Sequence, residues 1–101
     1  MDEISVQALK SRMDNNETLN IVDVREDYEY EEYNIGATLI PLDEMVDRME
    51  ELEPFKEKEL IIHCRSGSRS MQAKLFLEDL GFKNVLNLTG GMLAWQKAFD
   101  S

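Results

Sequence analysis

Cys64, the only cysteine of the sequence, opens a short loop of small and cationic residues, "CRSGSRS", at positions 64–70. The reactive form of a cysteine is the thiolate, which is stabilised by nearby positive charge or by N–H groups at a helix N-terminus. Arg65 and Arg69 supply permanent charge and forked hydrogen-bond donors. Gly67 lets the backbone turn so that its N–H groups can surround an anion. The loop therefore predicts a nucleophilic Cys64 beside an anion-binding site, and a buried cysteine with a purely structural role is the alternative.

The sequence has too few cysteine and histidine residues for the other sites that these residues commonly form. His63, the only histidine, precedes Cys64, and successive side chains of a strand point to opposite faces. We therefore predict a structural role for His63. One adjacent Cys–His pair cannot form a tetrahedral zinc site, and a Cys–His protease dyad needs a histidine that faces the cysteine. No glycine-rich phosphate loop with its lysine is present, so we predict neither a metal nor a cofactor.

Short apolar runs alternate with amphipathic segments along the chain. The apolar runs, predicted as strands, cover residues 19–24, 37–40, 59–64 and 84–88. The amphipathic segments, predicted as helices, cover residues 4–13, 42–52, 68–80 and 92–99, and the polar stretch 25–34 can hold a short helix. Strands separated by helices predict one α/β domain over residues 1–101, with a central, mainly parallel sheet flanked by helices. In such sheets ligands bind at the carboxyl ends of the strands, where Cys64 is expected.

Apolar side chains at helical spacing define the expected buried faces. Ser5 is a predicted N-cap between the apolar residues Ile4 and Leu9. The expected core residues of the later helices are Leu42, Met45, Val46, Met49, Leu52, Ala73, Phe76, Leu77, Leu80, Met92, Trp95 and Phe99. Gly81 is predicted to end the helix over residues 68–80.

The negative charge of the chain is concentrated in its first half. Residues 1–53 carry 16 acidic and four basic residues, whereas residues 54–101 carry five acidic and seven basic ones. A net charge of −10 repels nucleic acid and anionic membranes, so we predict neither as a partner. The acidic N-terminus lacks the apolar stretch of a secretory signal, and no run approaches the ~18 apolar residues of a membrane span. Since one cysteine forms no internal disulfide, we expect a cytoplasmic protein.

Three motifs resemble those of the single-domain rhodanese family, over essentially the whole chain. "CRSGSRS" is similar to the active-site loop of that family, in which a nucleophilic cysteine opens a six-residue turn. "DVRE" at 23–26 is similar to the Asp-x-Arg stretch after its second strand. "NLTGGMLAW" at 87–95 is similar to the glycine pair and tryptophan that introduce its last helix. The sequence departs from the family at "YNIGA", where many members have a histidine in place of Tyr33, so no role of that histidine is carried over.

This resemblance implies a three-layer rhodanese-like fold and a sulfurtransferase. Cys64 would attack the outer sulfur of a small anionic donor such as thiosulfate and become a persulfide. A thiophilic acceptor, cyanide or a thiol, would then remove the sulfur. The residues expected to bind the donor and the terminal sulfur are Arg65, Ser66, Gly67, Ser68 and Arg69. The residues expected to support the loop are Ser70 and the pair Asp23 and Arg25, which would form a structural ion pair. The serines of the loop are expected mainly to cap the following helix.

Two other functions stay open. One is a persulfide carrier or regulatory domain that acts on a protein partner without turnover of small acceptors. The other, which we rank lower, is a cysteine phosphatase, because some phosphatases resemble the rhodanese fold. Those enzymes use Cys-x5-Arg, which would require arginine at Ser70, whereas Arg69 gives Cys-x4-Arg. The shorter turn suits one sulfur atom better than a phosphoryl group.

Overall fold

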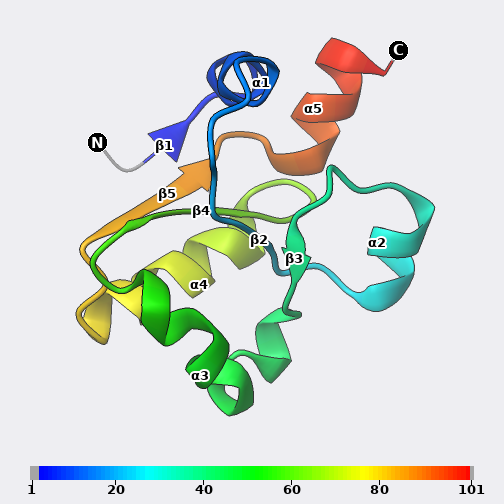
Figure 1. The fold of residues 1–101 in the computed structure, drawn as a ribbon. Coiled ribbons are helices and arrows are strands. Elements are labelled where there is room, and N and C mark those ends of the chain that lie inside the picture. Colours follow the sequence, from blue (N-terminus) through cyan, green and yellow to red (C-terminus); the bar gives the residue numbers. More distant parts are fainter. Residues whose placement is uncertain (1–2, 101) are drawn as a thin grey trace.

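Five strands form one sheet in the computed structural model, which describes residues 3–100 (Figure 1). The strands are β1 (Glu3–Ile4), β2 (Ile21–Asp23), β3 (Thr38–Leu39), β4 (Glu59–His63) and β5 (Asn84–Leu88). Their order across the sheet is β1-β5-β4-β2-β3, and every neighbouring pair is parallel. Parallel neighbours need a crossover connection, which explains why apolar and amphipathic segments alternate. The predicted α/β class with a mainly parallel sheet is confirmed.

Helices cover both faces of the sheet and so make three layers (Figure 1). The helices are α1 (Val6–Asp14), α2 (Asp27–Glu32), α3 (Met49–Leu52), α4 (Ser68–Asp79) and α5 (Gly91–Phe99). On one face α1 and α5 pack over a buried cluster that includes Leu9 and Trp95. On the other face α3 and α4 pack over a second cluster, which includes Leu52 and Leu77. No helix within residues 3–100 is long and apolar enough to cross a membrane.

The strand β4 lies in the middle of the sheet, between β5 and β2. Its side chains alternate between the two clusters, with Leu60 and Ile62 on the α4 side and Ile61 on the opposite side. Cys64 follows the strand and belongs to the cluster on the α4 side. Both faces of β4 are therefore apolar, and the strand delivers Cys64 to the carboxyl edge of the sheet.

The N-terminal residues differ from the predicted first helix. Glu3 and Ile4 pair with β5 as an edge strand, so the helix begins only at Val6. Ser5 caps it as predicted, since its Oγ accepts the N–H of Ala8 at 3.0 Å. A strand of two residues is too short to show alternation, which is why the sequence does not reveal β1.

The segment 42–52, predicted as one amphipathic helix, is broken into shorter turns. It forms 3-10 turns at Leu42–Glu44 and Val46–Arg48 before α3, and another 3-10 turn follows at Glu53–Phe55. Side chains three residues apart lie on one side of a 3-10 turn, so Leu42 and Met45 both still contact the core. Val46, which a continuous α-helix would bury, is 67% exposed. The prediction of one helix is wrong because apolar residues three apart fit either type of helix.

Two apolar residues near helix ends are more exposed than predicted. Leu80 and Phe99 are 44% and 39% exposed. Leu80 is the C-cap of α4, where the chain turns away through Gly81 with a φ of 97°. Phe99 ends α5 and packs edge-on against Trp95, with 4.9 Å between the ring centroids. Since helix ends project beyond the sheet, the apolar pattern overestimates their burial.

Candidate active site

The loop after β4 is held against the N-terminus of α5. The N–H groups of Met92 and Leu93 donate to the carbonyl oxygens of Cys64 and Arg65, each at 2.9 Å. A Cβ at Gly91 would stand 2.6 Å from both of these oxygens, so the approach requires glycine. In a trans peptide the N–H points away from the preceding carbonyl. Because both carbonyls point to α5, the N–H groups that follow them turn away from α5.

The sulfur of Cys64 occupies the position of a helix cap. Helix α4 begins behind Gly67, which has a φ of 115° and offers no side chain to the helix. The N–H of Gly67 donates to Cys64 Sγ at 3.1 Å, and the N–H of Ser70 donates to it at 3.4 Å. First-turn N–H groups have no partner inside a helix, and the positive end of the helix dipole lies beside the sulfur. No serine among the described residues accepts a hydrogen bond from this turn. The Cys64 sulfur therefore caps the helix, where the sequence predicts a serine cap.

These contacts favour the thiolate form of Cys64. The residue is 1% exposed, and burial raises the pKa of its thiol because it removes water from the charged form. Hydrogen bonds from Ser70 and from the N–H groups of Gly67 and Ser66 outweigh burial, so the net effect is a pKa below the ordinary value. The loop thus brings N–H groups to the sulfur, as its composition predicts.

Asn87 of β5 joins the network around the sulfur, although no role for it is predicted from the sequence. Ser70 Oγ lies 3.4 Å from Cys64 Sγ and donates to Asn87 Oδ1 at 2.5 Å. Asn87 Nδ2 in turn donates to the carbonyl of Gly67 at 3.3 Å. The only available signal is a polar residue inside the apolar run "NVLNL", since a buried amide needs hydrogen-bond partners. Asn87 therefore fixes the Ser70 hydroxyl and the loop carbonyl in relation to each other.

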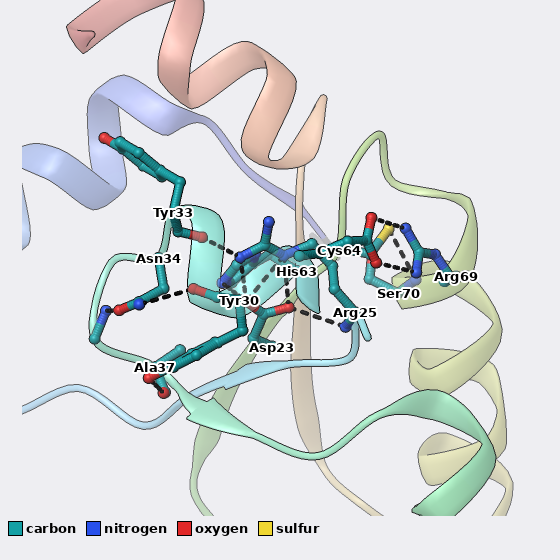
Figure 2. A network of polar contacts seen from close by, with 12 residues as sticks. Asp23, Arg25, Tyr30, Tyr33, Asn34, Ala37, His63, Cys64, Arg69 and Ser70 are labelled. Atoms are coloured by element: carbon teal, nitrogen blue, oxygen red, sulfur yellow. Dashed lines mark hydrogen bonds and ion pairs between the residues drawn. The ribbon is translucent and has the colours of Figure 1, made fainter. Parts of the chain in front are cut away.

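Asp23 and Arg25 form a buried ion pair at the end of β2 (Figure 2). Arg25 Nε lies 3.0 Å from both Asp23 carboxylate oxygens, and Nη2 lies 2.8 Å from Oδ2. The same guanidinium donates to the carbonyl of Tyr33 at 2.7 Å, and Tyr33 follows α2 directly. Among the described residues, no hydrogen bond joins this pair to residues 65–69. The pair thus holds α2 against the sheet, and it reaches the loop only through α2.

His63 lies fully buried beside the Asp23 carboxylate, away from the sulfur. Its Nε2 is 3.6 Å from Asp23 Oδ2, and neither ring nitrogen has a hydrogen-bond partner among residues 3–100. Burial lowers the pKa of His63, although Asp23 acts in the opposite direction. The neutral form of His63 is thus favoured, and its side chain lies beside Asp23, in line with a structural role.

The two arginines of the loop have different surroundings. Arg69 binds Glu29 of α2 through two parallel contacts, Nη1 to Oε1 at 2.7 Å and Nη2 to Oε2 at 3.0 Å. The hydrogen bond from Arg69 is the main reason that the pKa of Glu29 is lowered to about 2. Arg65 is exposed, as are Ser66 and Ser68, and its guanidinium has no partner within residues 3–100. Glu29 is one of five acidic residues between positions 26 and 32, so composition does not distinguish it.

A family model described as the rhodanese-like domain matches residues 5–98. The chain belongs to the rhodanese family. Its loop, its Asp-x-Arg pair and its double glycine thus lie within a rhodanese-like domain.

Relatives of this rhodanese-like domain include two proteins of Bacillus subtilis (strain 168). "Putative sulfurtransferase YtwF" is 44% identical over 95 residues, which cover 93% of this chain and 89% of that protein. "Putative sulfur carrier protein YrkF" is 45% identical over 94 residues, which cover 92% of this chain but 50% of that protein. The chain thus spans half the length of the sulfur carrier protein. A solved rhodanese-like domain protein from Staphylococcus aureus superposes with a TM-score of 0.84 at 34% identity, over 94% of this chain and 91% of that one.

Proposed function

We propose that this protein is a sulfurtransferase that carries a sulfane sulfur on Cys64 from a donor such as thiosulfate to cyanide or a thiol. One observation carries the proposal: the N–H groups of Gly67 and Ser70 donate to Sγ at 3.1 and 3.4 Å, and the Ser70 hydroxyl lies 3.4 Å from it. Membership of the rhodanese family and the similarity to a protein named as a sulfurtransferase support it.

In the first half-reaction the Cys64 thiolate attacks the outer sulfur of the donor. A new S–S bond forms to Sγ, while the bond between the two donor sulfurs breaks and its electron pair leaves with sulfite. The product is a Cys64 persulfide that carries one negative charge. The N–H groups of residues 65–69 would hold the terminal sulfur, and Arg65 would attract the anionic donor.

In the second half-reaction the acceptor attacks the terminal sulfur of the persulfide. The electron pair of the S–S bond returns to Sγ, and the sulfur leaves as thiocyanate or as the persulfide of the accepting thiol. Since the contacts around Sγ lower the pKa of the thiol, they also make Cys64 a better leaving group. A lone thiol that must stay reduced suits a reducing compartment, so a cytoplasmic location is part of the proposal.

A persulfide carrier is the second candidate, and the similarity to "Putative sulfur carrier protein YrkF" favours it. A carrier would load sulfur on Cys64 in the same way but would release it to a partner protein. The two functions differ in the second half-reaction only.

Intact mass spectrometry after incubation with thiosulfate tests the common step. We expect the protein to gain the mass of one sulfur atom, and the Cys64→Ser variant to gain none. Rapid turnover to thiocyanate on addition of cyanide identifies a sulfurtransferase, whereas stable loading without turnover identifies a carrier. Cys64-dependent hydrolysis of p-nitrophenyl phosphate faster than sulfur transfer would instead favour a phosphatase.

A further inference from the structure

A small cleft of about 100 Å³ lies beside the Cys64 loop, between α2 and α5. Its charged lining consists of Arg25 and Arg65 opposite Glu29 and Glu32. Arg25 is already neutralised by the buried Asp23. The cleft therefore contains one unpaired guanidinium, that of Arg65, next to two carboxylates.

Arg69, the other cation of the loop, is held by Glu29 on the cleft wall. The contact is bidentate, and the side chains are 30% and 13% exposed, so water screens it only in part. Glu29 is itself fixed, because its Oε1 accepts the N–H of Glu26 at 2.9 Å. Arg69 keeps its place near the sulfur, but Glu29 cancels its charge and occupies its two terminal nitrogens.

This pairing matters for the charge of an incoming donor. Thiosulfate brings two negative charges toward a cysteine that must itself be a thiolate to react. Among the residues that line the cleft, Arg65 alone offers a free counter-charge. The carboxylates of Glu29 and Glu32 add repulsion, and such repulsion is strong in a partly desolvated site. A donor that carries one negative charge or none meets a smaller barrier.

The rest of the cleft wall suits an organic group. Met92 and Leu93 of α5 and Tyr33 after α2 line it. Leu93 is 43% exposed, so part of its side chain is free to contact a ligand. Met92 and Leu93 offer apolar contact to the carbon chain of a thiol compound, and the neutral polar groups of the wall are the Gln96 amide and the Tyr33 hydroxyl.

We propose that Glu29 determines donor specificity by holding Arg69, so that the site accepts sulfur from organic persulfides in preference to inorganic dianions such as thiosulfate. The inference rests on the proposed loading of Cys64. In the reaction the thiolate attacks the outer sulfur of R–S–SH, a Cys64 persulfide forms, and the electron pair of the broken S–S bond leaves on the thiolate RS⁻.

The test measures second-order rates of Cys64 loading by intact mass, with thiosulfate and with the persulfide of 2-mercaptoethanol as donors. We expect the unsubstituted protein to load faster from the organic persulfide. Glu29→Gln keeps the shape and the hydrogen bond to Glu26 but releases the charge of Arg69. It should raise the rate with thiosulfate on the order of tenfold, through a lower KM. The rate with the organic persulfide should rise less than the rate with thiosulfate, since that donor carries at most one negative charge where thiosulfate carries two.

Two further variants separate this effect from a general change in charge or fold. Glu31→Gln removes the same charge from an exposed position of the same helix and should change either rate by less than about twofold. In an Arg69→Ala background, Glu29→Gln should no longer accelerate thiosulfate loading.

A gain that persists without Arg69, an unchanged thiosulfate rate in Glu29→Gln, or faster loading of the unsubstituted protein from thiosulfate would each overturn the inference. The donor comparison on the unsubstituted protein decides the matter even if Glu29→Gln does not fold. No uptake of sulfur from either donor would refute the proposed function itself, and the inference with it.

Discussion

Replacing Gly91 by alanine should detach the Cys64 loop from α5. The added Cβ would stand 2.6 Å from the carbonyl oxygens of Cys64 and Arg65, and both are backbone atoms that cannot rotate away. The loop or the helix must therefore move. The two hydrogen bonds that orient the loop, from the N–H groups of Met92 and Leu93, should be lost.

The expected loss of stability has two parts. Gly91 has a φ of 58°, and a side chain in the left-handed region costs about 1–2 kcal/mol. Loss of the two hydrogen bonds adds about 0.5–1.5 kcal/mol each. The total of about 2–5 kcal/mol is a large share of the roughly 5–15 kcal/mol that stabilise a typical domain.

Gly36→Ala is the matched control. Gly36 has a φ of 85°, but a Cβ there would meet nothing within 4 Å. This variant should lose only the backbone part, about 1–2 kcal/mol. Urea unfolding at neutral pH measures both variants, and alkylation of Cys64 against pH reports on the loop. Gly91→Ala should also raise the pH midpoint of alkylation, which Gly36→Ala should not change. Equal losses of stability, with an unchanged midpoint in both, would refute the reasoning.

Other variants test the charged groups around the loop. The alkylation midpoint of Cys64 should lie below the roughly 8.5 of a free cysteine and should rise in Ser70→Ala, which removes the hydroxyl 3.4 Å from the sulfur; a midpoint at the free value would rule out an activated thiol. The pKa of Glu29 is lowered from 4.5 to about 2, so its contribution to stability is complete above pH 4.5 and is lost as the pH falls toward 2. Glu29→Gln should lack this loss, which urea unfolding at neutral pH and at about pH 3 would detect; the same pH dependence in both proteins would contradict it. Asp23→Asn should cost about 3–5 kcal/mol in thermal or urea unfolding, because Arg25 stays buried without its counter-charge; a loss below about 1 kcal/mol would show that the pair is dispensable.

Features that rest on a regular pattern could be predicted from the sequence. The continuous apolar run before Cys64 predicts a central strand, and β4 is that strand. The composition of residues 64–70 predicts a loop that favours a thiolate, and the N–H groups of Gly67 and Ser70 do point at the sulfur. Both follow from local chemistry, which needs no knowledge of distant residues.

Features that depend on tertiary contacts could not be predicted. Glu29 lies 40 positions before Arg69 in the sequence, and four similar acidic residues surround it. Asn87 reaches the loop only because β5 is next to β4. Likewise, the turns at 42–52 follow from how that segment covers the sheet, since its apolar spacing fits either helix type. Periodicity shows which face of an element is apolar, but it does not show which polar side chains meet across elements.

The sulfur of Cys64 couples the chemistry of the loop to the stability of α4. The N–H groups that stabilise the thiolate are the ones that the first turn of the helix leaves unpaired. A thiolate accepts these hydrogen bonds better than a thiol, so the cap is strongest in the reactive state. In the proposed loading step the charge of the site does not change, because thiosulfate arrives and sulfite leaves with two charges each. The single negative charge only moves one atom outward, from Sγ toward the N–H groups of residues 65–69. A loop with one free guanidinium, at Arg65, is suited to hold this single negative charge through the whole cycle. A second free cation would have to be neutralised whenever no donor is bound.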